Sequence, residues 1–247
     1  MKILKIAAII CSGFVLALPC LAVAGPVDTV NVVHDGYGAH DVAAVWGGGL
    51  SGIELYSGVY MLDKSAGVGV GQTWPNGPIP SFCIELHELS PHSTVTYQVT
   101  SPKNVYNSFL DAKIGDTKAN YLREMWGRFY DDGWANGGPY CPQQNRDAEA
   151  FAAAVWEIVY EDLPSSPAGW DVASTSGSHG FRCTDIDTAK ANYYLHSLTG
   201  CGPKADLRAF VYQGKQDYIV EVPEPATITL LGLSGVLSLV RRKRTAS

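Results

Sequence analysis

The sequence predicts a mainly β protein with helical insertions, an α+β domain in which about three helices accompany an antiparallel β-sheet or small barrel. Between residues 28 and 100, short runs rich in β-branched and aromatic residues are bounded by Gly, Pro or Asn, a pattern typical of strands. The middle of the chain changes to apolar residues at helical spacing, and β-type runs return near residue 210. Together these patterns favour one β-rich domain.

The predicted strands alternate with turn-forming residues. We expect strands at 42–46, 53–60, 81–86, 93–99, 209–212 and 218–222. Between the first two, Gly47-Gly48-Gly49 predicts a loop. This loop lacks the glycine spacing and the following helix of a phosphate-binding loop, so we assign it no ligand.

Three segments have the apolar spacing of helices. We expect helices at 117–130, 146–160 and 185–198. In the first, Tyr121, Met125 and Phe129 recur every four residues and form one apolar stripe. In the second, Phe151 and Val155 share a face, which we expect to pack on the sheet.

The N-terminal residues have the order of a secretory signal peptide. A short basic head precedes an apolar stretch over 6–21, and Ala22 and Ala24 place small residues at the −3 and −1 positions. We therefore predict a signal peptide over 1–24 that signal peptidase removes. The alternative is a lipoprotein signal in which Cys20 is the lipidated residue.

The C-terminal residues predict a temporary membrane anchor. Val222-Pro223-Glu224-Pro225 precedes an apolar run at 226–240, and Arg241-Arg242-Lys243-Arg244 follows it. As a helix this run would cover only about 22 Å, less than the roughly 30 Å of a bilayer core. The basic cluster should stay in the cytoplasm, which leaves the bulk of the chain outside.

This order of motif, short span and basic tail resembles the PEP-CTERM sorting signal. The resemblance implies that an exosortase, a membrane cysteine protease-transpeptidase, cuts near the motif, and that the membrane is only a transient partner. The predicted organisation is a signal peptide at 1–24, an extracellular domain at 25–221 and a sorting signal at 222–247. An ordinary single-pass tail anchor is the alternative reading of the same tail.

Composition narrows the class of protein further. The net charge is −6, and no basic stripe exists outside the two termini, which argues against a nucleic-acid partner. Charged residues make up only 17%, as expected of an extracellular β-rich domain. After the signal peptide is removed, the chain retains Cys83, Cys141, Cys183 and Cys201. In an oxidising compartment an even set of cysteines usually pairs, and several connectivities are open.

Two segments resemble the thioester domains of bacterial surface proteins. Phe82-Cys83-Ile84-Glu85 is followed by a helical segment at 150–161 that contains Trp156, and Gln216-Asp217 fits the same pattern. The resemblance implies that this cysteine is the thioester cysteine, and it places the partner glutamine four residues before the Trp, where this chain has Ala152. Alanine has no side-chain carbonyl, so we expect the scaffold to remain and the thioester chemistry to be lost.

A structural disulfide is the predicted substitute for the thioester. Cys141 lies in the loop that leads into the second helix, so pairing with Cys83 would hold strand and helix together and stabilise the fold by a few kcal/mol. Cys183 and Cys201 bracket the third helix and would then form a second disulfide. A free Cys83 thiol is the alternative.

Other candidate sites are weaker, and we predict no catalytic residue, no metal and no cofactor. Cys83, Glu85 and His87 would be spaced by about 6.5 Å along a strand, too far for a hydrogen-bonded nucleophile system. His87 and His92 lack a third ligand, and Asp131-Asp132 lacks the alternating oxygen ligands of a calcium loop. Aromatic residues in Gly- and Pro-rich loops could stack on sugar rings: Trp74, Trp134, Tyr140 and Trp170.

These inferences predict an exported, exosortase-processed protein that is not an enzyme. We expect an inner-membrane intermediate in a Gram-negative-type cell, and then the cell surface, the outer envelope or the extracellular matrix. The leading function is non-covalent adhesion, or retention in extracellular polysaccharide. The alternative is a covalent adhesin whose Cys83 thioester or thiol captures a host or matrix amine. An extracellular hydrolase is disfavoured because no nucleophile–base pair with suitable geometry is evident.

Overall fold

The computed structural model describes residues 27–175 and 180–224. The predicted signal peptide and the sorting signal after Glu224 lie outside the described residues. Within the described part, no helix is long and apolar enough to cross a membrane. The predicted span at 226–240 falls outside that part.

In the described ranges the chain forms nine strands and three α-helices. The strands are β1 (Thr29–Gly47), β2 (Leu50–Val68), β3 (Gly77–Cys83), β4 (Val95–Thr100), β5 (Tyr106–Asn107), β6 (Ala112–Lys113), β7 (Arg182–Thr184), β8 (Leu207–Tyr212) and β9 (Lys215–Glu221). The helices are α1 (Gly115–Phe129), α2 (Pro142–Tyr160) and α3 (Thr188–His196). The predicted fold class is confirmed.

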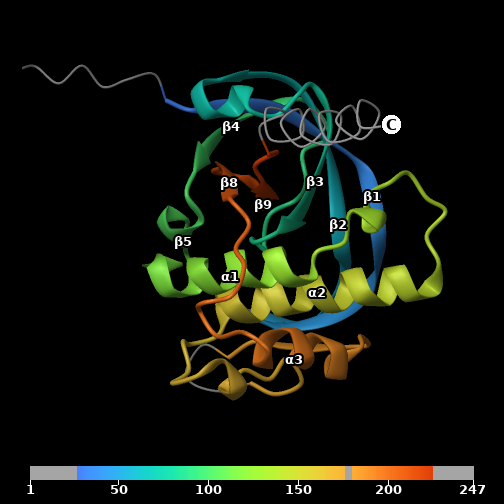
Figure 1. Cartoon of the computed structure of the whole chain (residues 1–247), viewed down its shortest axis with the longest axis vertical. Coiled ribbons are helices and arrows are strands. Elements are labelled where there is room, and N and C mark those ends of the chain that lie inside the picture. Colours follow the sequence, from blue (N-terminus) through green and yellow to red (C-terminus); the bar gives the residue numbers. More distant parts are fainter. Residues whose placement is uncertain (1–26, 176–179, 225–247) are drawn as a thin grey trace, which may run out of the picture.

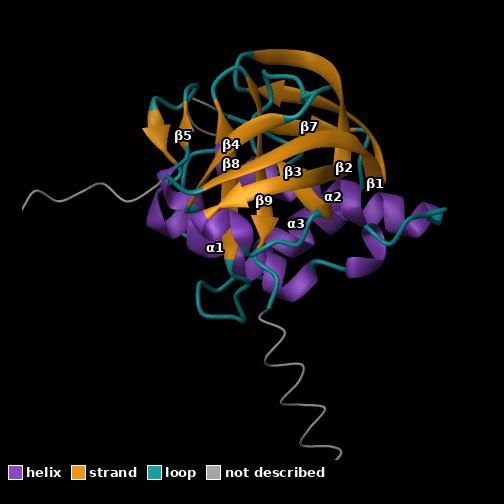
Figure 2. Cartoon of the chain, turned by 90° about the horizontal axis from the view of Figure 1, so that it is seen from above, coloured by secondary structure: helices purple, strands orange, loops and turns teal. Residues whose placement is uncertain are grey.

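Six strands form a closed antiparallel ring. The order of pairing is β1-β2-β3-β9-β8-β4, and β4 pairs again with β1. The short strand β7 pairs with the far end of β1. Figure 2 shows the strands curving over the helices. Closure gives each strand of the ring two neighbours over part of its length, which favours the barrel over the open sheet.

The β1–β2 hairpin is much longer than the sequence predicts. Gly48 and Gly49 form a two-residue turn with φ of +60° and +84°, and Gly47 pairs with Leu50 across it. Positive φ at both positions is what a tight hairpin turn of this hand requires. The expected strands at 42–46 and 53–60 are parts of 19-residue strands, because glycines such as Gly36 lie at register shifts inside a strand instead of ending it.

Helix α2 is the buried centre of the molecule. It contacts β1, β2, β3, α1 and α3, and all residues from Ala148 to Tyr160 are buried. Figure 1 shows the strands above the layer of α1 and α2, with α3 below it. The Phe151 ring lies 4.8 Å from the Phe82 ring of β3, as the predicted packing on the sheet requires. The sequence predicted that only one face of this helix is buried, but the helix is covered on all sides and buries every face from Ala148 onward.

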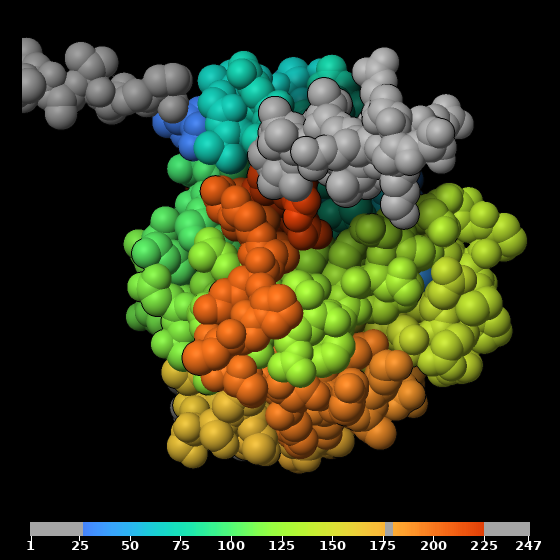
Figure 3. All heavy atoms as spheres, viewed as in Figure 1, coloured from blue at the N-terminus to red at the C-terminus, as the bar shows by residue number. Residues whose placement is uncertain are grey.

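The last described segment is held on the surface of the fold. After α3 the chain crosses the outer side of α1 and continues into β8 and β9, as the orange-to-red atoms in Figure 3 show. The Ala205 amide donates to the Arg123 carbonyl on α1, at 3.0 Å, and the Val222 amide donates to the Asp206 carbonyl, at 2.8 Å. The sorting motif therefore begins directly at the edge of the folded domain.

Two carboxyl groups on α2 lie inside this packing. Glu149 is 3% exposed and Glu157 is 1% exposed. One Glu157 oxygen accepts a hydrogen bond from the Asp171 amide at 3.0 Å, and the other has no partner. Burial raises the pKa of each group to about 8 from an ordinary value of 4.5. The folded protein therefore holds both side chains in the protonated, neutral form at neutral pH.

These raised pKa values predict that the fold is more stable in mild acid than in mild base. The stabilising contribution of a protonated carboxyl is complete below its unfolded pKa, and it is lost as the pH rises from 4.5 through the folded value of about 8. Denaturant melts should give a higher midpoint at about pH 5.5 than at about pH 8.5. Glu157→Gln should flatten this difference, whereas Glu54→Gln, at an exposed position, should not. Equal wild-type midpoints at both pH values would contradict the assignment.

Candidate functional site

The candidate site begins where β3 pairs with β9. Cys83, the last residue of β3, lies opposite Tyr218, and the Ile84 amide continues the ladder by donating to the Asp217 carbonyl at 3.0 Å. Residues two apart on a strand share a face, so Gln216 lies diagonally across from Cys83 on the same face. The expected strand at 81–86 ends at Cys83, and residues 84–94 form a loop around the site.

The side chains of Cys83 and Gln216 are in direct contact. The Gln216 amide nitrogen Nε2 lies 2.8 Å from the Cys83 sulfur Sγ. The thiol donates to the Glu85 carbonyl at 2.8 Å, and Ser90 Oγ donates to Gln216 Oε1 at 2.7 Å. Cys83 is 2% exposed and Gln216 is 7% exposed. A thiol and a carboxamide, the two groups of an internal thioester, are thus held together away from solvent.

Burial keeps the cysteine in its neutral form. Desolvation raises the pKa of the Cys83 thiol far above its ordinary value, and this outweighs the opposing hydrogen bonds from its neighbours. Reactive cysteines, in contrast, have a lowered pKa and an exposed thiolate. The surroundings of Cys83 therefore disfavour a freely reactive thiol.

Helix α2 supports this site through its aromatic residues. Trp156 Nε1 donates to the Cys83 carbonyl at 2.9 Å, and the Tyr160 hydroxyl accepts from the Leu86 amide at 2.9 Å. These bonds hold the end of β3 and the start of the loop. Ala152, where the resemblance placed the partner glutamine, is a buried packing residue. The carboxamide that contacts the cysteine comes from Gln216 on β9.

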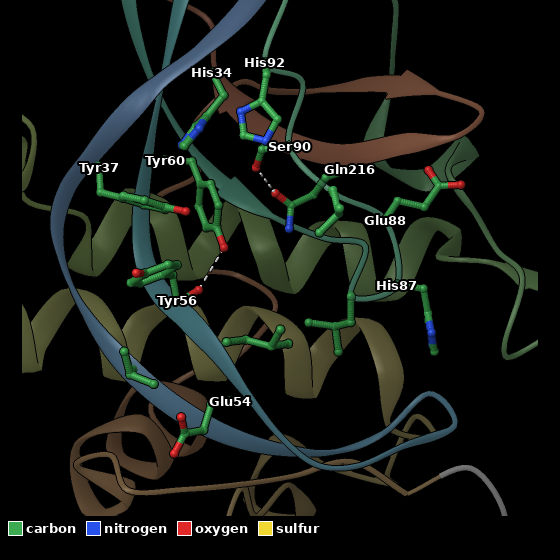
Figure 4. A pocket seen from close by; sticks show the side chains of 14 residues that line it. His34, Tyr37, Glu54, Tyr56, Tyr60, His87, Glu88, Ser90, His92 and Gln216 are labelled. Carbon is green, nitrogen blue, oxygen red and sulfur yellow. Dashed lines mark hydrogen bonds between the residues drawn. The ribbon is translucent and has the colours of Figure 1, made fainter.

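A cavity of about 540 Å³ opens above the contact. Figure 4 shows side chains from β1, β2 and the 84–94 loop around it. The labelled lining residues are His34, Tyr37, Glu54, Tyr56, Tyr60, His87, Glu88, Ser90, His92 and Gln216. The Tyr37 ring lies 4.6 Å from that of Tyr56 and 5.0 Å from that of Tyr60, so one wall is aromatic. Gln216 therefore lines the same cavity as these tyrosines and histidines.

The predicted disulfides are wrong. All four cysteines in the described ranges are free: Cys83 and Cys183 are buried, and Cys141 and Cys201 are exposed. Cys83 points into the core toward Gln216, whereas Cys141 caps the N-terminus of α2 at the surface, so the two thiols face different surroundings. Cys183 lies on β7 inside the fold, which separates it from exposed Cys201 in the same way.

The other predicted groups have structural roles. Trp74, Trp134 and Trp170 are 1–3% exposed, so these three rings are core residues that are not available to stack on sugars, while Tyr140 is half-buried. Asp131 accepts from the Gly133 amide and caps a short turn after α1. Within the described residues, no group of three or more His, Cys, Asp or Glu side chains could hold a metal ion.

The nucleophile system Cys83–Glu85–His87 does not assemble. The Glu85 carboxylate accepts hydrogen bonds from the His87 and Glu88 backbone amides, at 2.8 and 2.5 Å, and so closes the turn after β3. Sequence reasoning missed the contact between Gln216 and Cys83. The available signal was its place just before the last strand, which fits the thioester-domain pattern but does not identify a partner.

Burial also predicts which cysteines react. In the native protein, iodoacetamide should label Cys141 and Cys201, which are exposed, and spare Cys83 and Cys183, which are not. Peptide mapping after native labelling measures this directly. Modification of Cys83 at the same rate as Cys141 would contradict the buried site, and Cys201 serves as the internal standard for an exposed thiol.

Comparison with known proteins informs the tail of the chain. The PEP-CTERM protein-sorting motif matches residues 221–244, which confirms the predicted sorting signal and includes Pro223-Glu224-Pro225 and the basic cluster. No curated protein and no solved structure matches the chain, so the thioester-domain resemblance stays a prediction. The sorting motif indicates an exported, cell-surface or extracellular protein that an exosortase sorts.

Proposed function

We propose that this exported protein is a covalent adhesin that forms an internal thioester between Cys83 and Gln216. The observation that carries the proposal is the 2.8 Å contact between Gln216 Nε2 and Cys83 Sγ in a buried, preformed pair. The two residues lie 133 positions apart in the chain, yet strand pairing places them side by side. In this proposal the absence of a glutamine at position 152 does not prevent thioester formation, because Gln216 on β9 supplies the carboxamide.

The proposed bond forms without an external oxidant or reductant. The Cys83 sulfur adds to the Gln216 side-chain carbon Cδ, the carbon–sulfur bond forms, and the carbon–nitrogen bond breaks. The amide nitrogen leaves as ammonia after taking up the thiol proton, so the product is lighter by about 17 Da. Proximity and fixed orientation supply much of the rate, as in other intramolecular reactions of well-placed groups.

The cavity above the pair suits an amine acceptor. Its tyrosine wall and the Glu54 and Glu88 carboxylates favour a cationic group on an apolar stem. Once deprotonated, the amine attacks the Gln216 carbonyl carbon, a carbon–nitrogen bond forms, and the carbon–sulfur bond breaks. Cys83 recovers its proton and the protein remains attached through an amide. Low exposure of Cys83 and Gln216 protects the bond from water before capture.

A second candidate function is non-covalent retention in extracellular polysaccharide. The tyrosine wall of the cavity favours it, since aromatic faces pack well against sugar rings. In this case Cys83 and Gln216 would remain a thiol and an amide. The mass of the purified protein separates the two functions.

Intact-mass spectrometry tests the thioester. The wild-type protein, purified gently without amines, should weigh about 17 Da less than its linear sequence, and methylamine should then add about 31 Da. Cys83→Ser and Gln216→Glu should show neither change, because each removes one partner of the bond. A wild-type mass equal to that of the linear sequence would refute the covalent function and leave the non-covalent one.

A matched variant distinguishes the two glutamine positions. Ala152→Gln supplies a carboxamide where the resemblance placed it, but on a buried, tightly packed helix. We expect Ala152→Gln to be destabilised by roughly 1–3 kcal/mol through overpacking, with no additional mass loss. The contradicting outcome involves the double variant. If Gln216→Glu abolishes the mass loss and the addition of Ala152→Gln to that variant restores it, position 152 can supply the partner of Cys83.

The sorting signal generates a separate prediction. In cells that contain an exosortase, the mature surface protein should lack the residues after about Pro225, since the motif precedes a span and a basic cluster that halt export. C-terminal peptide mapping of protein released from the surface measures this. Recovery of residues 241–247 on the mature protein would show that the tail is a permanent anchor.

A further inference from the structure

Ser90 is fixed by the backbone on both sides. It lies on the loop between β3 and β4, where the backbone carbonyl of Leu89 accepts a hydrogen bond from the backbone N–H of Gln216 at 3.2 Å. The carbonyl of Pro91 accepts from the His34 amide at 3.1 Å. One bond ties the loop to β9 and the other ties it to β1, so the hydroxyl between them has little freedom to move.

The Ser90 hydroxyl meets one particular atom of the candidate pair. Its Oγ donates to Gln216 Oε1 at 2.7 Å, while the nitrogen of the same amide faces Cys83 at 2.8 Å. Figure 4 shows the Ser90 contact as a dashed line inside the cavity. The two ends of the carboxamide are thereby distinguished: the nitrogen lies at the sulfur, and the oxygen lies at a hydroxyl donor.

We propose that Ser90 is a catalytic residue that stabilises the oxyanion on Gln216 Oε1 whenever the acyl group is transferred. This inference rests on the proposed Cys83–Gln216 thioester. When sulfur adds to Cδ, or when an amine later adds to the same carbon, the carbonyl π electrons move onto Oε1. A hydroxyl already placed at that oxygen stabilises the charge without further reorganisation.

The Ser90 hydroxyl donates to the same oxygen in both proposed steps, formation of the thioester and its later reaction with an amine. Oε1 stays on the acyl carbon when ammonia leaves, and it stays again when Cys83 leaves, so one hydrogen bond serves bond formation and acceptor capture. No atom of Ser90 is transferred in either step. Ser90 therefore differs from Cys83 and Gln216, whose replacement removes the bond itself.

The test compares Ser90→Ala with Ser90→Thr in the full-length mature protein. Intact mass gives the fraction of each protein that carries the thioester, and the methylamine reaction of that fraction gives a rate per intact bond. We expect the Ser90→Ala rate to fall roughly a hundred- to a thousandfold, since one oxyanion donor is removed. Ser90→Thr retains a hydroxyl and should react at close to the wild-type rate. Ser93→Ala, on the same loop at an exposed position, should change nothing.

The outcomes separate this inference from the thioester itself. A Ser90→Ala thioester that reacts at the wild-type rate overturns the role of Ser90 and leaves the covalent function standing. Absence of mass loss in the wild type overturns both. A third outcome is that Ser90→Ala forms no thioester, unfolds at the wild-type temperature, and differs in this from Ser90→Thr, which forms the bond. This outcome supports a role of Ser90 in bond formation. If Ser90→Ala is unfolded, the role of Ser90 is structural and the proposal is overturned.

Labelling of the Cys83 thiol in the unfolded chain provides an additional test. If the wild-type protein has lost about 17 Da but Cys83 in the unfolded chain still accepts iodoacetamide, the acyl group lies on a nucleophile other than the Cys83 sulfur. The Cys83–Gln216 thioester and the oxyanion role of Ser90 would then both be wrong, and the Ser90 hydroxyl at Gln216 would be the first nucleophile to test. A blocked Cys83 together with the slow Ser90→Ala reaction is the expected result.

Discussion

The pairing of β3 with β9 is the constraint on which the rest of the structure depends. The pairs Ser81–Val220, Phe82–Ile219 and Cys83–Tyr218 close the strand ring, which would otherwise open between β3 and β9. The same register sets which side chains meet inside the ring. A shift by one residue would turn Gln216 to the opposite face, so barrel closure and the Cys83–Gln216 contact have a common cause.

Helix α2 makes this register stable. Its Phe151 packs on Phe82, and its Trp156 and Tyr160 bond to the backbone at and after Cys83. The helix also buries Glu149 and Glu157, and this burial raises the pKa of both carboxyl groups. A rigid interior of this kind suits chemistry that requires two neutral groups to be held together and shielded.

The sorting motif and the folded domain are physically continuous. Glu221, the first residue of the matched motif, is the last residue of β9. Trp126 Nε1 donates to its carboxylate at 2.8 Å, and Trp74 Nε1 donates to its carbonyl at 2.7 Å. The exosortase therefore meets a substrate whose cleavage region begins where a hydrogen-bonded strand ends. The cavity proposed to accept an amine is lined by other residues, from β1, β2, the 84–94 loop and Gln216, so it is distinct from the surface at the sorting motif.

Local patterns in the sequence predicted a signal peptide and determined the sorting signal, the β-rich class and the places of the three helices, because composition, periodicity and end motifs are properties of short segments. They also identified Cys83 and Trp156. Only the tertiary structure decided that Gln216, 133 residues from Cys83, is its partner, since strand register between distant segments has no local signature. For the same reason, the disulfides inferred from the cysteine count were wrong: pairing depends on where the thiols point in the fold, and burial separates Cys83 from Cys141.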